Sequence, residues 1–278
     1  MRSSEKGKAL EDEGRQALSR GLATAWGVKD RPGKGPKPGL SLERIVEVAV
    51  QVAETEGLSA VSMSRVATVL GAGTMALYRY VESKEELLML MMDAAFREHP
   101  LPPAPDEPWR VAVERWARQH LAVLRKHPWV VRIALGGPPI TPNQVVWFER
   151  GMSSLSGTGL PEMAKLDSLS LINGWVRHEA MLEADLREAE RRAGTNAAEA
   201  LTSYWHTLGV LTDVQRFPAL SALVAAATSD AAATSDAQFT FGLERILDGI
   251  AHVGKRRGPQ RRTPRSVRQK RNHPPAGT

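Results

Sequence analysis

The sequence predicts an all-α protein, and two observations support that prediction. From Leu40 to about Gly254 the apolar residues recur at helical spacing, in stretches separated by glycine and proline, and no segment has the convincing pattern of a strand. Apolar residues make up 42% of the 278 residues and charged residues 24%, which is typical of a globular protein with material for a core. We therefore expect a helical protein of one large or two smaller domains.

The helix boundaries follow from capping residues and breakers. Ser41 and Ser62 precede apolar-periodic stretches as N-caps, and Gly57 ends the first of these helices. Ser83 caps a further helix, with Glu86 in place to complete a capping box. The predicted helices span residues 41–56, 62–69, 74–80, 83–97, 106–126, 128–135, 142–155, 161–193, 196–210, 213–227 and 236–254, with a further short helix around Leu18, Leu22 and Trp26.

A proline-rich hinge divides this helical body. Four prolines lie between His99 and Glu107, a density that excludes helix and favours an extended link. We therefore expect a three-helix helix-turn-helix domain over residues 40–99 and a larger helical domain over residues 106–254.

The composition excludes several classes of protein. The chain has no cysteine, which rules out disulfides, zinc–thiolate sites, iron–sulfur ligation and cysteine nucleophiles. The N-terminus lacks the apolar stretch of a signal peptide, and no run approaches the roughly 18 apolar residues of a membrane span, so we expect a cytoplasmic protein with no membrane contact. The seven histidines are scattered and no catalytic motif is found, so we expect no enzyme activity, no catalytic residue, no metal and no cofactor.

The formal net charge of +6 is unevenly distributed. Residues 1–39 hold nine Lys or Arg against five Asp or Glu, and residues 255–278 hold nine against none, which leaves −7 on residues 40–254. The two ends are rich in polar residues, proline and glycine, so we expect a mostly disordered basic arm and a disordered basic tail. The positive charge of these ends favours a polyanionic partner.

Residues 62–81 meet the physical requirements of a helix-turn-helix. Two short helices that cross closely need a small residue at their contact, and Ala67 provides it. The sharp turn needs a residue that tolerates a left-handed conformation, and Gly71 does so. Leu70 and Leu77 fall where apolar side chains must hold the second helix against the first.

These residues resemble a known family. Residues 40–96, and above all TMALYRYVESKEEL at 74–87, resemble the DNA-binding domain of TetR-type transcriptional regulators, and FTFGLERILDGIA at 239–251 is similar to the closing helix of TetR-like ligand-binding domains. The resemblance implies a homodimer whose recognition helices enter successive major grooves of a near-palindromic double-stranded DNA operator. It further implies a repressor that a small apolar or aromatic effector releases from DNA.

The resemblance assigns the DNA contacts residue by residue. Arg79 is expected to read a guanine edge, because a guanidinium can pair with O6 and N7 together. Lys84, at a helix N-terminus, is expected to hold a phosphate. Because residues 40–99 carry five cations and nine acids, we expect Glu56 and other acids to face away from DNA while Arg65 faces it; Tyr80 can equally be core. The predicted DNA-binding residues are Ser62, Arg65, Thr74, Met75, Ala76, Tyr78, Arg79, Tyr80 and Lys84.

Six of the seven tryptophans lie in the larger domain, which favours an apolar or aromatic ligand, although most of them can equally be core. His178 or Asn173 would be the polar anchor of such a pocket. The predicted ligand-binding residues are Trp147, Met152, Asn173, Trp175, His178 and Trp205.

The resemblance also implies that two helices, at residues 161–193 and 236–254, form the four-helix bundle of the dimer interface. Their predicted interface stripes are Leu166, Leu169, Ile172 and Val176, and Phe239, Leu243, Ile246, Leu247 and Ile250. The helix at 84–97 joins the two domains and is the expected transmitter between effector and DNA.

Two rival functions remain at this point. One is an architectural protein that binds DNA through its basic tails without a preferred sequence. The other is an all-helical enzyme with a buried apolar site, which no motif supports directly.

Overall fold

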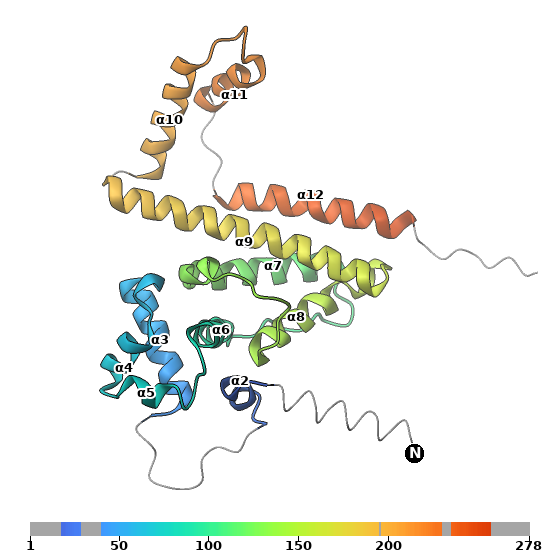
Figure 1. Ribbon diagram of the computed structural model, residues 1–278. Helices are drawn as coiled ribbons and strands as arrows, with labels where there is room; N and C mark the ends of the chain where they lie inside the picture. The colour runs from blue at the N-terminus through green and yellow to red at the C-terminus, as the bar shows by residue number, and fades with distance from the viewer. Residues whose placement is uncertain (1–17, 29–39, 195, 230–234, 257–278) are drawn as a thin grey trace, which may run out of the picture.

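The structure is a computed structural model that describes residues 18–28, 40–194, 196–229 and 235–256, and every regular element in these ranges is a helix (Figure 1). The all-α prediction is therefore confirmed. The rest of the predicted arm and tail lies outside the described residues. The α-helices are α2 (Arg20–Ala25), α3 (Leu42–Glu56), α4 (Met63–Leu70), α5 (Thr74–Leu77), α6 (Lys84–Ala95), α7 (Trp109–Lys126), α8 (Pro142–Ser154), α9 (Glu162–Ala193), α10 (Ala197–Leu211), α11 (Pro218–Ser229) and α12 (Ser235–Arg256), and the short 3-10 turns are η1 (Leu58–Ala60), η2 (Pro128–Arg132) and η3 (Ser156–Thr158).

Helices α3, α4 and α5 form a small unit whose ends follow the local signals in the sequence. Ser62 Oγ accepts a hydrogen bond from the backbone N–H of Arg65 at 3.1 Å and thereby caps α4. Gly71 ends α4 in the left-handed conformation, with φ of 64°. Ala67 is buried at the contact with the next helix, and Leu77 is buried beneath α5. The local geometry expected of a helix-turn-helix is therefore present.

Helix α6 connects this unit to the rest of the molecule. It packs on α3 on one side and on α2 and α8 on others, and Leu87 and Met91 are fully buried along it. Ser83 Oγ accepts from the backbone N–H of Glu86, so the predicted N-cap is confirmed. The other half of the predicted capping box is wrong, because the Glu86 carboxylate accepts from the backbone N–H of Glu82 instead of that of Ser83.

The same carboxylate holds an N-terminal segment that the sequence assigned to the basic arm. Glu86 Oε1 accepts from Ser19 Oγ and from the backbone N–H of Leu22, which fixes the start of α2. Trp26 Nε1 donates to the carbonyl of Ile140 at 2.8 Å, just before α8. The short helix expected in this region is confirmed, and for residues 18–28 the expectation of disorder is corrected.

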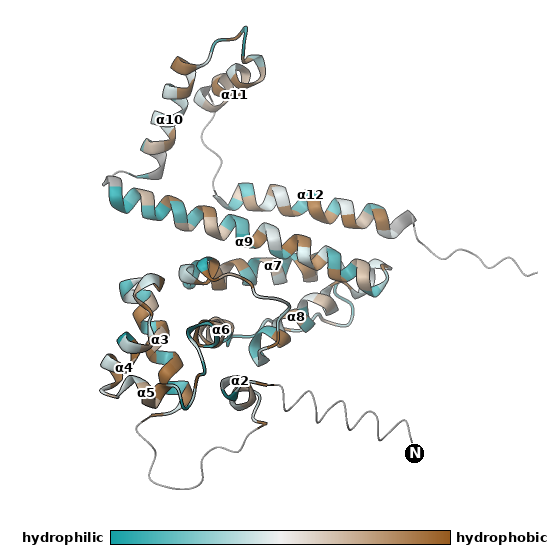
Figure 2. Cartoon of the chain, viewed as in Figure 1, coloured by the Kyte–Doolittle hydropathy of each residue, from teal (hydrophilic) through white to brown (hydrophobic). Residues whose placement is uncertain are grey.

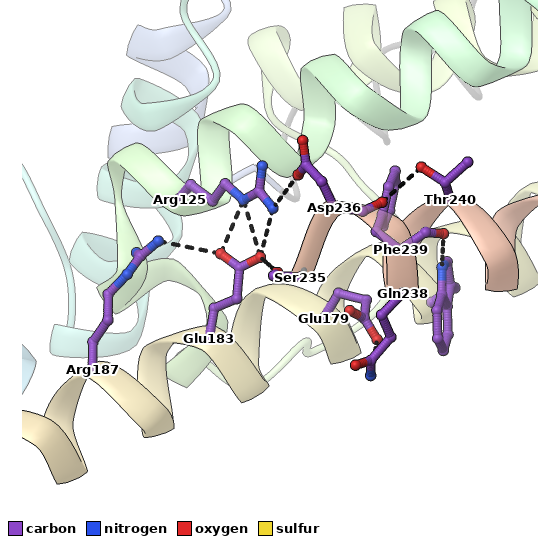
Figure 3. Close-up of polar contacts among 10 residues, drawn as sticks. Arg125, Glu179, Glu183, Arg187, Ser235, Asp236, Gln238, Phe239 and Thr240 are labelled. Carbon is purple, nitrogen blue, oxygen red and sulfur yellow. Dashed lines mark hydrogen bonds and ion pairs between the residues drawn. The ribbon is translucent and has the colours of Figure 1, made fainter. Parts of the chain in front are cut away.

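The larger part of the fold is built on α9, a helix of 32 residues. Helices α7 and α12 pack along it, and α8 crosses between α6, α7 and α9 (Figure 1). Figure 3 shows how one arginine ties three of these helices together. The guanidinium of Arg125 on α7 pairs with Glu183 on α9 at 2.6 Å and with Asp236 on α12 at 2.9 Å.

The two predicted dimer stripes belong mostly to the core of the single chain. Leu169, Ile172 and Val176 on α9 are buried within the chain, because α7 and α12 cover that side of the helix. On α12, Phe239, Leu243, Leu247 and Ile250 are likewise buried. The assignment of these residues to an interface is therefore wrong, since helical periodicity marks a covered face without saying what covers it.

Helices α10 and α11 form a hairpin that projects from the end of α9 (Figure 1). Few of its residues are strongly hydrophilic, as Figure 2 shows. Val210 and Leu211 are both more than 70% exposed, and Tyr204 is 53% exposed. This hairpin therefore presents apolar surface that the described part of the chain leaves exposed.

Within the described residues, no helix is long and apolar enough to cross a membrane.

Candidate DNA-binding surface and effector cavity

Helix α5 presents an exposed surface at the edge of the α3–α4–α5 unit. Its N-terminus follows the Gly71 turn, and burial of Leu77 fixes which side of the single turn faces inward. Met75 is 77% exposed and Tyr78 is 42% exposed, and Arg79 is also exposed. Thr74 and Ala76, which lie beside them, are partly exposed. The predicted recognition residues thus lie together on an accessible face.

The helix that carries this surface is shorter than predicted. The sequence predicted helix over 74–80, but α5 ends at Leu77, and the backbone N–H groups of Tyr80 and Val81 both bond to the carbonyl of Leu77. Tyr80 is partly buried, and its hydroxyl donates to the carbonyl of Leu40 at 3.1 Å. Tyr80 therefore also holds the segment just before α3, and its place on the reading surface stays a prediction.

The Arg65 guanidinium is paired with a carboxylate. It makes a two-pronged contact with the Glu56 carboxylate, with Nη2 at 2.6 Å and Nε at 3.0 Å from the two oxygens. The hydrogen bond and the charge of Arg65 lower the pKa of Glu56, and Glu56 raises that of Arg65. Glu56, which is expected to face away from the phosphates, therefore lies against one of the cations that are expected to face them.

Arg79 and Lys84 remain as the unpaired cations of this surface. Neither has an acidic partner within 4.0 Å in the described part of the chain. Lys84 is the first residue of α6, so its ammonium group and the free N–H groups of that helix end can meet the same phosphate. Ser62 is partly exposed at the start of α4, although its hydroxyl already serves as the helix cap.

A cavity of about 520 Å³ lies between α6, α7, α8 and α9. Its aromatic wall comes from Phe96, Trp116 and Trp147, whose rings meet edge to face. The indole N–H of Trp116 donates to the carbonyl of Trp147, and that of Trp147 donates to the carbonyl of Phe96. Since both donors are already bonded, these side chains offer apolar ring surface to an occupant.

The structure brings only two of the six predicted ligand residues to this cavity. Trp147 and Asn173 line it, whereas Met152, Trp175, His178 and Trp205 do not. Trp175 Nε1 instead donates to the carbonyl of Phe239 and packs α9 against α12, where a side chain at Gly242 would collide with the indole. Trp205 lies on the α10–α11 hairpin.

Sequence reasoning missed five polar residues of the cavity wall: His120, Gln144, Asp167, Ser170 and Arg177. Burial and the charge of Arg177 lower the pKa of His120 to about 3, so the imidazole is neutral at neutral pH. The signal that could have revealed Arg177 is its helical spacing from Asn173, four residues earlier on the same face of α9. His120 carried no such signal, because a lone histidine in an apolar stretch is usually core.

A buried carboxylate on α6 bonds this helix to α8, which forms part of the cavity wall. Asp93, on α6, accepts hydrogen bonds from the backbone N–H groups of Asn143 at 2.9 Å and Gln144 at 3.1 Å, in the first turn of α8. Gln144 and Trp147 of α8 line the cavity, as does Met92 of α6. Lys84 lies eight residues before Met92 on the same helix, which is about 12 Å along its axis. One rigid helix therefore spans from the DNA-binding surface to the cavity wall.

Among the residues that the structure describes, no group of three or more histidine or acidic side chains is arranged to hold a metal ion.

Comparison with known proteins follows the same division of the chain. Residues 45–90 match the family described as bacterial regulatory proteins, tetR family, and residues 101–253 match the tetracyclin repressor-like C-terminal domain. The chain is 38% identical over 252 residues to the HTH-type transcriptional repressor DrrR1 of Streptomyces coeruleorubidus, covering 90% of this chain and 92% of that one.

Solved structures agree with these matches. Apo ActR from Streptomyces coelicolor is 29% identical, with a TM-score of 0.68, and the alignment covers 80% of this chain and 99% of ActR. ActR in complex with actinorhodin is 30% identical, with a TM-score of 0.66 and coverage of 79% and 99%.

Proposed function

This chain belongs to the TetR family of transcriptional regulators, and we propose that it is a dimeric repressor that a small aromatic effector releases from its operator. Residues 40–99 would bind DNA and residues 106–254 would bind the effector and the second copy. The observation that carries the proposal is the continuity of α6 from Lys84 beside the recognition surface to Met92 in the cavity wall.

The DNA-binding half rests on the exposed face of α5. Met75, Tyr78 and Arg79 would contact base edges and backbone in the major groove, with Thr74 and Ala76 beside them. Lys84 would hold a phosphate and fix the register of the domain on the duplex. Arg65 would contribute only by exchanging Glu56 for a phosphate, which makes it a weaker contact than Arg79.

The effector-binding half rests on the aromatic cavity. Its volume of about 520 Å³ falls within the usual range for small-molecule sites. Support also comes from ActR, a similar structure that has been solved in complex with actinorhodin. Trp147 and Asn173 would contact the effector in this chain, whereas Met152, Trp175, His178 and Trp205 would act only in packing or at the dimer interface.

An occupant would reach the DNA-binding half through two links between α8 and α6. Asp93 bonds the first turn of α8 to α6, and the Trp26–Ile140 hydrogen bond ties α2, itself held by Glu86 of α6, to the segment before α8. A shift of α8 around an effector would therefore tilt α6 and change the spacing of the two recognition helices. The effector can release DNA only to the extent that it binds the tilted state more tightly.

A second copy would pack on the exposed sides of α9 and α12. Leu171 and Met181 on α9 and Phe241 and Val253 on α12 are apolar and exposed in the single chain. The apolar α10–α11 hairpin would extend the same interface. Dimerisation is typical of the family and is what a two-fold operator requires.

The experiment is a fluorescence anisotropy titration on the duplex that this protein selects from random DNA, repeated with a panel of planar aromatic compounds. At least one compound is expected to weaken binding of the native protein about tenfold or more, within the usual range of allosteric coupling. The Ser170→Trp variant places a large side chain in the cavity. It is expected to bind the operator as the native protein does, but without weakening of that binding by the compound. Binding that no compound alters, or an unchanged response in the variant, would argue against the proposal.

A further inference from the structure

The cavity wall contains a cation that no acidic side chain of the described residues neutralises. Arg177, on α9, is half-buried and lines the cavity. In the described part of the chain no carboxylate lies within ion-pair distance of its guanidinium. Its only bonded partners there are the carbonyls of Val131 and Ile133, each at 3.4 Å. These contacts are long, so they compensate poorly for taking the charge out of water.

Two neighbouring arginines, unlike Arg177, have an acidic partner. Arg125 on α7 and Arg187 on α9 both pair with Glu183. Burial alone lowers the pKa of Arg177, with no acidic partner to raise it again. The guanidinium nevertheless stays charged at neutral pH, because arginine does not deprotonate in proteins.

Among the lining residues Arg177 is the single positively charged group, and most of the others are apolar or aromatic. His120, on α7, is more than nine-tenths buried and uncharged at neutral pH, and its Nδ1 has no hydrogen-bond partner in the described residues. Asp167 also lines the cavity, but it lies ten residues before Arg177 on the same helix, about 15 Å along the axis. The carboxylate is therefore at the opposite end of the site and does not pair with the cation.

Asn173 lies one helical turn before Arg177 on the same face. Its side-chain amide and the guanidinium can donate to one carboxylate together, as a planar fork favours. Trp116 and Trp147 line the same cavity and supply apolar ring surface against which an aromatic body can pack.

We propose that the effector is an aromatic carboxylate, with its rings against Trp116 and Trp147 and its carboxylate paired with Arg177 and Asn173. The inference rests on the proposed function for the role of the cavity and adds the chemical class of the ligand. It assigns Arg177 as the residue that selects an anion over a neutral molecule of the same shape.

The test compares 2-anthracenecarboxylate with 2-anthracenecarboxamide, which has the same rings and no charge. Isothermal titration calorimetry on the full-length native protein is expected to give at least about tenfold tighter binding of the carboxylate, because hydrogen bonds to a charged partner are the stronger ones. Arg177→Gln is expected to abolish the preference, and Arg177→Lys is expected to retain part of it.

Arg187→Gln is the matched control, since it removes an exposed arginine from the same helix without touching the cavity. It is expected to keep the full preference. Circular dichroism checks that the Arg177 variants are folded. If they do not fold, the native protein's preference for the carboxylate over the carboxamide still tests the proposal. Equal affinity for the two probes, no binding of either, or a preference that survives in folded Arg177→Gln would overturn the proposal.

The same probes separate this inference from the proposed function. If operator DNA is released equally by the carboxamide, ligand-responsive repression holds and the anion preference fails. If the carboxylate binds through Arg177 but leaves operator affinity unchanged, the ligand class holds and the regulatory proposal fails.

Discussion

At the scale of single residues, the DNA contact of this protein depends on very few cations. Arg65 is paired with Glu56 by two hydrogen bonds, and Arg44 contacts Glu47 on α3. Arg79 is exposed beside α5, and Lys84 stands at the N-terminus of α6. The two residues should therefore differ in how they affect sequence preference.

Replacing Arg79 by Gln is expected to weaken operator binding at least about tenfold and to relax the preference at one base pair, because a bidentate guanine contact is lost.

Lys84→Gln should weaken binding to all sequences alike and lower the salt dependence of log Kd by about one counterion, because one phosphate contact is lost. Anisotropy titrations between low and moderate salt measure both effects. Arg44→Gln serves as the control, and an effect of equal size there would show that general charge, rather than these positions, governs binding.

His120 couples stability to pH. Its pKa is lowered from 6.5 to about 3 in the folded chain, so between these values the unfolded chain binds a proton that the folded chain excludes. The free energy of unfolding should therefore be highest above pH 6.5 and fall as the pH drops toward 3, with a slope of up to about 1.4 kcal/mol per pH unit from this group. Urea denaturation at several pH values, compared between the native protein and His120→Gln, measures it. Parallel pH profiles for the two proteins would contradict this account.

At the scale of elements, the sequence predicts what local physical chemistry determines. Ser62, Gly57 and Gly71 specify helix ends through their own side-chain oxygen or backbone freedom, and each of these ends lies where it was expected. The recognition helix was predicted to continue to residue 80 because its residues are compatible with helix. In the structure it stops at Leu77, and the Tyr80 hydroxyl bonds to the carbonyl of Leu40, a long-range contact that leaves no periodic signal.

The cavity was predicted less completely for a similar reason. Tryptophan count indicated an aromatic pocket, but which indole reaches it depends on how α9 is rotated against α7 and α12. Trp147 faces the cavity and Trp175 faces α12, and both look alike in the sequence. Burial then shows that the Arg177 guanidinium has no acidic partner and that His120 Nδ1 has no hydrogen-bond partner among the described residues.

Helix α6 can be tested as the transmitter by cutting its link to α8. Asp93→Asn should lower the free energy of unfolding by about 1–2 kcal/mol, as loss of a charged helix cap does. It should leave operator and effector affinities near native while reducing the change in operator affinity that the effector causes. The measurement is operator binding with and without saturating effector. Glu98→Gln, which alters an exposed acid that follows α6, should keep full coupling, and full coupling in Asp93→Asn would exclude this link.

At the scale of the whole molecule, the account requires a dimer whose interface is the uncovered side of α9 and α12. Phe241 is 63% exposed on α12, while Phe239 two residues earlier is fully buried in the core. One side of α12 therefore belongs to the core and the other side is free to contact a second copy, and periodicity alone did not separate the two.

Phe241→Glu is expected to dissociate the dimer and to weaken operator binding, because burying an unpaired carboxylate in an apolar interface is unfavourable. Size-exclusion chromatography with light scattering gives the mass directly. Leu101→Glu introduces the same charge at another exposed apolar position and should leave the dimer intact. If the Phe241→Glu protein keeps the dimer mass, the interface does not include this side of α12, and the α10–α11 hairpin becomes the next surface to test.

The measurement that tests the central claim most directly is operator selection. The purified full-length protein is incubated with random duplex DNA, and the bound fraction is sequenced over several rounds. A dimer that presents two copies of α5 should enrich one sequence made of two inverted half-sites about one helical turn apart, or a small multiple of that spacing. A flat profile without a preferred sequence would contradict the account and favour an architectural protein that binds DNA through its basic ends.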